Sequence, residues 1–225
     1  MSLDLNTIVQ YPLPDDQYFK EEIKKTQIYI HHTAGGANAI NVIEGWKKDS
    51  VRIGTALVVA GKPSKTSKYK EGEIYQAFPS KYWAYHLGLK KDVFEKRGIV
   101  YTALDKVSVG IEICNWGQVT LTDKGWETYV GSTIPESEVV EYSTPFRGYR
   151  HYHKYTNAQL ESTKNLLQFL CDKLNIPKTF AKEKFFDINE DALKGVSGIY
   201  THINVRTDKN DCHPQPELIQ MLESL

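Results

Sequence analysis

Short apolar runs rich in β-branched and aromatic residues alternate along the chain with longer segments of helical periodicity. Runs of this length and composition favour β-strands. The predicted strands cover residues 27–32, 55–60, 73–78, 107–117 and 198–202. A polar loop joins the second of these runs to the third, which is typical of an antiparallel hairpin.

Helical segments lie between and after these strands. Asn38 is placed to cap a helix that carries Ile43 and Trp46 on one face. The stretch Thr156-Asn-Ala-Gln159 has the form of a capping box and opens a longer helix with an apolar stripe of leucines. A short terminal helix is predicted at 216–224. Strands separated by helices, with one hairpin, predict an α/β fold in which a central mixed β-sheet is flanked by helices.

The first 26 residues differ from the rest of the chain. Residues 1–22 are polar, and Pro12 and Pro14 interrupt any helix there. We expect an extended arm that leads into a short helix near residues 17–24. Residues 27–225 then form a single domain, because a chain of 225 residues supplies one substantial core and not two.

Composition and charge exclude several classes of partner. The chain has 28 basic and 28 acidic residues, and this balance argues against a nucleic-acid partner, which needs a basic excess or patch. No apolar run approaches the roughly 20 residues that span a bilayer. No signal-peptide pattern is visible, so the protein either is made in the cytoplasm or has lost an export signal. Three widely spaced cysteines predict reduced thiols, and we expect a monomer.

Polar residues at the strand ends carry the candidate chemistry. His31 ends the first strand, His202 ends the last, and Asp211 follows nine residues later. Two imidazoles and a carboxylate are a common protein set for catalytic zinc, although each residue taken singly has an ordinary structural explanation. Glu112 alternates with apolar residues in the strand at 107–117. A carboxylate in such a setting is costly to bury without a partner or a task.

Four sequence blocks support this constellation in order along the chain. They are Ile-His-His-Thr-Ala-Gly, Tyr-Gln-Ala-Phe-Pro with the later His-Leu-Gly, Val-Gly-Ile-Glu-Ile-Cys-Asn, and Tyr-Thr-x-x-Gln with the closing His…Lys-x-Asp. With these blocks the sequence resembles the zinc-dependent N-acetylmuramoyl-L-alanine amidases. That family includes amidase-type phage endolysins and peptidoglycan recognition proteins.

The resemblance implies a role for each matched residue. His31, His202 and Asp211 match the three zinc ligands, and Glu112 matches the catalytic carboxylate of many members. Lys209 matches the basic residue that stabilises the developing oxyanion in some members. The implied reaction is hydrolysis of the amide between N-acetylmuramic acid and L-alanine in peptidoglycan, with Glu112 as general base and then general acid.

Two positions depart from the family pattern. Some relatives place a catalytic tyrosine directly after the glycine that precedes the second strand, where this chain has Thr55. Without that tyrosine, Glu112 is the residue expected to carry out the proton transfers. At the third ligand, Asp211 is followed by Cys212 and His213, so a shift of one position would make Cys212 the ligand instead.

Other aromatic residues and histidines are candidates for substrate contact. His86 matches the His-x-Gly of the family and is expected to line the cleft, in contact with substrate or behind a ligand. Trp83 and Trp116 are candidate platforms for sugar or peptide. His32 points to the opposite face of its strand from His31, and we expect it to be structural.

Two other functions use the same fold. A recognition module would bind muramyl peptides without cutting them, and the complete ligand set together with Glu112 argues against it. A structural component of a phage particle would need no metal. An amidase without a visible signal suits either a phage-type lysin released from the cytoplasm or an exported enzyme whose signal has been removed.

Overall fold

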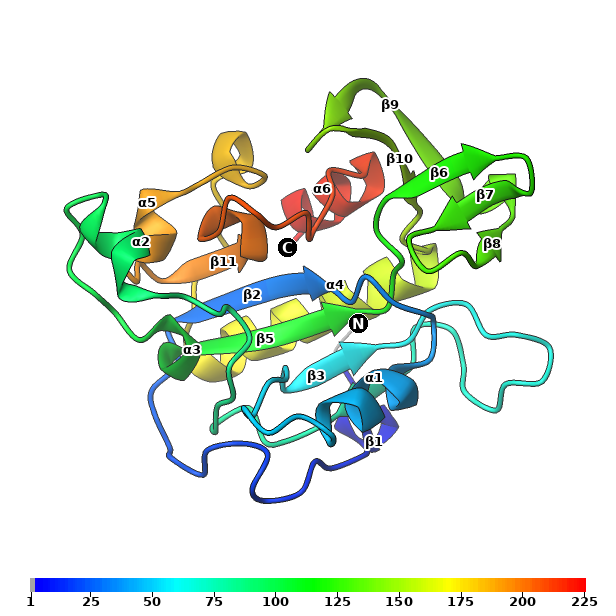
Figure 1. Cartoon of the computed structure of the whole chain (residues 1–225). Coiled ribbons are helices and arrows are strands. Elements are labelled where there is room, and N and C mark those ends of the chain that lie inside the picture. Colours follow the sequence, from blue (N-terminus) through cyan, green and yellow to red (C-terminus); the bar gives the residue numbers. More distant parts are fainter. Residues whose placement is uncertain (1–2) are drawn as a thin grey trace.

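A six-stranded mixed sheet forms the centre of the computed structural model, which describes residues 3–225 (Figure 1). The strand order is β1-β4-β3-β5-β2-β11. The strands are β1 (Val9–Gln10), β2 (Gln27–His32), β3 (Leu57–Val59), β4 (Ile74–Gln76), β5 (Ser108–Ile113) and β11 (Gly198–Thr201). Only the β3–β4 pair is antiparallel; the other neighbours in this sheet run parallel. The predicted mixed sheet and hairpin are therefore confirmed.

The two faces of the sheet bury different clusters. Ile28 and Ile30 of β2 face the main core, to which helices α4 (Asn157–Leu174), α6 (Pro216–Glu223) and α1 (Ala39–Trp46) also contribute. Helix α4 runs behind the sheet in Figure 1. Tyr29, which alternates with these isoleucines, packs on the opposite face against a smaller cluster that includes Leu87 and Phe94.

Local signals set the helix ends as predicted. The Thr156 side chain accepts a hydrogen bond from the Gln159 N–H, and the Gln159 side chain accepts one from the Thr156 N–H, which completes the capping box. The side chain of Asn38 caps α1 by accepting from the Ile40 N–H at 2.9 Å. These bonds satisfy donors that would have no partner within the helix.

A second group of strands is inserted after β5. Strands β6 (Val119–Thr122), β7 (Gly125–Thr128) and β8 (Thr133–Ile134) form a three-stranded antiparallel sheet, which we call the accessory sheet. Strands β9 (Val139–Phe146) and β10 (Tyr149–His153) form a hairpin. Figure 1 shows this region at the end of the molecule to which β2 and β5 point.

Local structure differs from the expectation in two segments. No helix forms at residues 17–24. Instead Phe19 forms an antiparallel bridge with Trp83, and the two rings stack with their centroids 3.9 Å apart. This tertiary pairing overrides the local pattern. Residues 90–106, for which the sequence pattern predicted no helix, contain α2 (Lys91–Glu95) and α3 (Leu104–Val107). Phe94 and Leu104 anchor these short helices because both side chains are buried.

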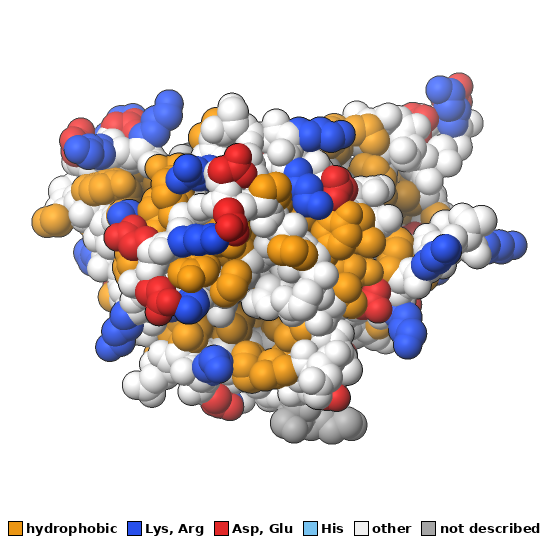
Figure 2. All heavy atoms as spheres, turned by 90° about the horizontal axis from the view of Figure 1, so that it is seen from below, with side chains coloured by type: hydrophobic (Ala, Val, Ile, Leu, Met, Phe, Trp, Pro, Cys, Tyr) orange, Lys and Arg blue, Asp and Glu red, His pale blue; other side chains and the backbone are white. Residues whose placement is uncertain are grey.

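The remaining short elements are 3₁₀ turns and one further helix. They are η1 (Leu5–Thr7), η2 (Glu136–Glu138), η3 (Lys182–Lys184), α5 (Glu190–Leu193) and η4 (His202–Asn204). Across residues 3–225 we find no helix that combines the length and the apolar character needed to cross a bilayer. On the face seen in Figure 2, basic and acidic side chains are interspersed rather than separated by sign.

Candidate active site

The register of two parallel strands places the first candidate residues side by side. His31 at the end of β2 is the partner of Glu112 in β5, and Tyr29 is the partner of Gly110. Because side chains alternate along a strand, His31, Tyr29, Gly110 and Glu112 all lie on one face of the sheet. Ser108, two residues before Gly110, lies on the same face.

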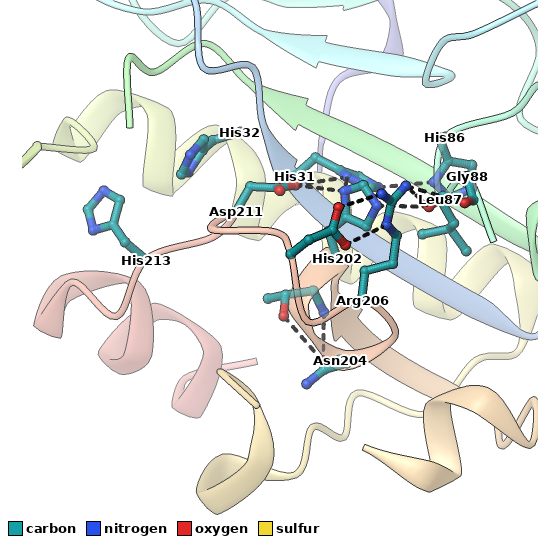
Figure 3. A network of polar contacts seen from close by, with 12 residues as sticks. His31, His32, His86, Leu87, Gly88, His202, Asn204, Arg206, Asp211 and His213 are labelled. Atoms are coloured by element: carbon teal, nitrogen blue, oxygen red, sulfur yellow. Dashed lines mark hydrogen bonds and ion pairs between the residues drawn. The ribbon is translucent and has the colours of Figure 1, made fainter. Parts of the chain in front are cut away.

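Three predicted ligands converge above the ends of these strands (Figure 3). His202 follows β11 in η4, and Asp211 lies in the loop before α6. The Nδ1 atoms of His31 and His202 are 3.2 Å apart, and each lies 3.1 Å from Oδ2 of Asp211. Burial alone would raise the pKa of Asp211, but the adjacent imidazoles outweigh burial and hold that pKa well below its usual range.

This triangle of donor atoms fits zinc. Tetrahedral zinc with bonds of about 2.0–2.1 Å separates its ligand atoms by about 3.3 Å, close to the three distances observed. Two imidazole nitrogens and a carboxylate oxygen are also the donor types that zinc takes in catalytic sites. Asp211, not Cys212, belongs to the cluster, and Cys212 lies buried in the main core.

A hydrogen-bonded chain runs from His31 away from the ligand triangle. Nε2 of His31 lies 3.0 Å from Nδ1 of His86, and Nε2 of His86 lies 2.8 Å from Oγ of Ser108. The Ser108 hydroxyl donates to the Leu104 carbonyl at 2.6 Å. If His31 binds a metal through Nδ1, its proton is on Nε2, and every link of the chain then has one donor and one acceptor.

The electrostatics and the packing of His86 agree with this proton arrangement. Burial lowers the pKa of His86, and the neighbouring His31 and His202 lower it further, so the ring stays neutral. Glycine at position 110 leaves room for the ring: a Cβ there would lie 3.2 Å from Nδ1 of His86 and 2.7 Å from Cγ2 of Thr55. Both ring nitrogens of His86 are engaged within the protein.

The backbone after His86 supports the second imidazole. Nε2 of His202 lies 3.0 Å from the Leu87 carbonyl oxygen, to which it can donate. The N–H groups of His86 and Leu87 both donate to Oδ1 of Asp105 at 2.8 Å. One loop therefore orients both imidazoles through their outer nitrogens.

Glu112 and Lys209 face the same pocket as the ligands, which has a volume of about 410 Å³. Among residues 3–225, the Glu112 carboxylate has no hydrogen-bond or ion-pair partner. Burial raises the pKa of Glu112 well above its usual range; the Asp211 carboxylate adds to this and the Lys209 ammonium opposes it. A carboxylate of this kind is suited to hold and release a proton beside the metal position.

The other predicted residues divide into two groups. Trp116 lines a groove that adjoins the metal pocket, next to Thr33 and Gly36. Trp83 instead is buried beneath Phe19 and donates to Glu21 at 3.1 Å, so we leave it out of the proposed site. His32 and His213 lie apart from the ligand cluster in Figure 3.

His32 is held in the interior as expected of a structural residue. Its Nδ1 lies 2.8 Å from the Tyr155 hydroxyl, and burial lowers its pKa to about 4. Ser108, Asp105 and the Leu104 carbonyl are site residues that were not predicted from the sequence. Only Ser108 carried a usable signal, because it shares the strand face of Glu112; the others depend on where a distant loop lies.

Comparison with known proteins agrees with this geometry. Residues 22–216 match the family model described as N-acetylmuramoyl-L-alanine amidase. The chain belongs to this amidase family. No curated protein shows significant sequence similarity to it.

Solved structures of amidases and endolysins share the fold at low sequence identity. The structure of PlyL is 14% identical with a TM-score of 0.51, and the match covers 96% of each chain. A mutant endolysin from Bacillus subtilis is 17% identical with a TM-score of 0.51, covering 100% of this chain and 96% of that one. AmiD from E. coli, an N-acetylmuramyl-L-alanine amidase, is 15% identical with a TM-score of 0.52. That match covers 90% of this chain and 59% of AmiD.

Proposed function

We propose that this protein is a zinc-dependent amidase that hydrolyses the bond between N-acetylmuramic acid and L-alanine in peptidoglycan. The family match supports the reaction class. The observation that carries the proposal is the complete His31–His202–Asp211 triangle, which shares one pocket with Glu112 and Lys209. AmiD was solved with the substrate anhydro-N-acetylmuramic acid-L-Ala-D-gamma-Glu-L-Lys, which suggests the substrate class for this chain.

His31, His202 and Asp211 are the proposed zinc ligands. When bound, the ion supplies Lewis-acid polarisation of the scissile carbonyl and lowers the pKa of water to about 7. The protein contributes the orientation of the two imidazoles, which the His86 ring and the Leu87 carbonyl fix from behind. Both ring nitrogens of His86 are already hydrogen-bonded within the protein, so this ring is not available to substrate.

Glu112 is the proposed general base and then general acid. Its carboxylate takes a proton from the attacking water and delivers that proton to the departing amide nitrogen, so one side chain serves both halves of the reaction. Its raised pKa favours the second half, because a carboxyl group that holds its proton near neutral pH is a better donor to the amine.

Lys209 is the proposed electrostatic stabiliser. It lies two residues before Asp211 and lines the metal pocket. Its ammonium group can donate to the carbonyl oxygen as negative charge develops there, and this interaction is stronger in the transition state than in the ground state. With Thr55 where some relatives have tyrosine, Lys209 and Glu112 are the only protic side chains assigned to the chemistry.

Release of the stem peptide tests this proposal. Purified protein is incubated with a muramyl peptide, with a chelator or with added zinc, and the products are measured by mass spectrometry. We expect free stem peptide only in the zinc-loaded sample, and none from Glu112→Gln with zinc. A protein that binds zinc and muramyl peptide but releases nothing would instead be a recognition module, and one without zinc binding would be a scaffold.

A further inference from the structure

The metal pocket opens into a different groove on each side. On one side it shares Thr33 and Ala34 with a groove of about 760 Å³. On the other it shares Ile53, His86 and Lys209 with a groove of about 380 Å³. The metal pocket therefore adjoins both grooves through different lining residues, and a substrate with two arms could place one arm in each.

The larger groove is uncharged in character, and we call it the neutral groove. The residues that give it this character are Asn38, Asn41, Ser67, Tyr69, Trp116 and Tyr129. Among the described residues that line it, the sole charged one is Lys62, whose ammonium pairs with Glu138 at 2.6 Å. Amides and hydroxyls beside aromatic rings match the hydroxyls and apolar ring faces of a sugar.

Two aromatic rings of the neutral groove come from after β5. Trp116 lies over Gly36, where a Cβ would meet its ring at 3.3 Å, so the glycine leaves the ring close to the loop. Tyr129 lies in the turn between β7 and β8 and is 64% exposed. The β7–β8 turn of the accessory sheet thus supplies one wall residue of the neutral groove.

The smaller groove combines apolar and cationic side chains, and we call it the basic groove. Its apolar part includes Ile53, Tyr85 and Leu89, and its cations are Lys90, Arg206 and Lys209. Arg206 is paired with Asp208 at 2.6 Å. Within residues 3–225, Lys90 and Lys209 have no ion-pair partner, and no acidic side chain lines this groove.

The substrate arms differ in the same way as the two grooves. The glycan arm carries amides and hydroxyls without charge. In a peptide arm such as L-Ala-D-gamma-Glu-L-Lys, the γ-linked glutamate leaves a free α-carboxylate and the chain ends in a second carboxylate, so two negative charges outweigh the one lysine ammonium. We propose, on the basis of the function proposed above, that the peptide arm lies in the basic groove and the glycan strand in the neutral groove. Charge complementarity in this way fixes the direction in which the substrate crosses the metal.

Binding measurements test this orientation without requiring turnover. Dissociation constants are measured by calorimetry on zinc-loaded protein carrying Glu112→Gln. The first ligand is the single-sugar muramyl tripeptide with free carboxylates, the second is the same compound with both carboxylates amidated, and the third carries the tripeptide on a tetrasaccharide.

Each groove has one variant and one matched control. Lys90→Glu should weaken binding of the acidic single-sugar ligand about fivefold or more, and should change the amidated ligand by less than twofold. Lys91→Glu, one residue outside the groove, is its control. Tyr129→Ala should weaken the tetrasaccharide ligand about fivefold and leave the single-sugar ligand unchanged. Leu121→Ala, exposed on the same accessory sheet, is its control.

The outcomes separate the two proposals. If Lys90→Glu responds to sugar number and Tyr129→Ala to peptide carboxylates, the orientation is reversed and our inference is wrong. If both variants bind every ligand as the parent protein does, the grooves do not select the arms, while the amidase proposal stands. Failure of the parent protein to bind any of the three ligands overturns the proposed function itself.

Discussion

Replacement of Ser108 by alanine tests how the first imidazole is held. The hydroxyl of Ser108 accepts from Nε2–H of His86 and donates to the Leu104 carbonyl, and the side chain is buried. Ser108→Ala removes both bonds at once. His86 then loses the contact that fixes its proton on Nε2. Its Nδ1 is therefore no longer held unprotonated as the acceptor for Nε2–H of His31.

Two magnitudes follow from this geometry. Each buried polar group left without a partner costs about 1–3 kcal/mol, and the variant leaves two of them. We therefore expect the free energy of unfolding of the metal-free protein to fall by about 2–4 kcal/mol, allowing for local relaxation. Loss of a hydrogen bond behind a ligand costs about 10–100-fold in metal affinity, so the zinc dissociation constant should rise by that factor.

Competition with a chromophoric chelator measures the zinc affinity, and urea unfolding of the metal-free protein measures the stability. Thr163→Ala is a suitable control, because it deletes a buried hydroxyl that donates to Gln159 within α4, remote from the site. The control should lose stability and keep its zinc affinity. A Ser108→Ala protein with zinc affinity within twofold of the wild type would refute the role of the chain behind His31.

Three further predictions address the ligands, the catalytic carboxylate and the pH dependence of stability. Asp211→Ala should lose zinc affinity by more than 100-fold, whereas Cys212→Ala should keep it; the reverse result in the same competition assay would move the third ligand by one position. Glu112→Gln should bind zinc normally and lower kcat about 10²–10⁴-fold, and retained turnover would remove Glu112 from the mechanism. Burial lowers the pKa of His153, so below about pH 6.5 the unfolded chain binds a proton that the folded chain does not, and stability falls with acid. In His153→Asn the amide oxygen can still accept from the Trp116 N–H. This variant should reduce the dependence of the free energy of unfolding on pH, measured by urea unfolding between pH 7 and 5. An unchanged dependence would show that His153 does not contribute to it in this range.

Strand periodicity accounted for much of the site before any tertiary contact was known. Alternation along residues 107–117 isolated Glu112 among apolar neighbours, and parallel pairing then set it beside His31. Alternation also separated His31 from His32, which the structure buries against Tyr155. These results follow from local geometry, because the side-chain period of a strand fixes which face each residue occupies.

The same local rules failed where a distant segment decided the outcome. The helix expected at 17–24 gave way to the pairing of Phe19 with Trp83, and that stack removed Trp83 from the cleft. His86 does line the cleft as predicted, but only the distant contacts with His31 and Ser108 decided that it lies behind a ligand. These contacts join residues far apart in the sequence, so no local sequence pattern predicts them.

The sequence by itself determined the strands, the helix caps, the ligand types and the family blocks, because these depend on periodicity, on capping chemistry and on residue identity at fixed spacing. Only the tertiary structure decided which loop lies behind each ligand and which grooves adjoin the metal pocket. The physical reason is that a side chain's second hydrogen-bond partner comes from wherever the chain returns in space. His31 finds His86 at 55 residues' separation and Asp211 at 180.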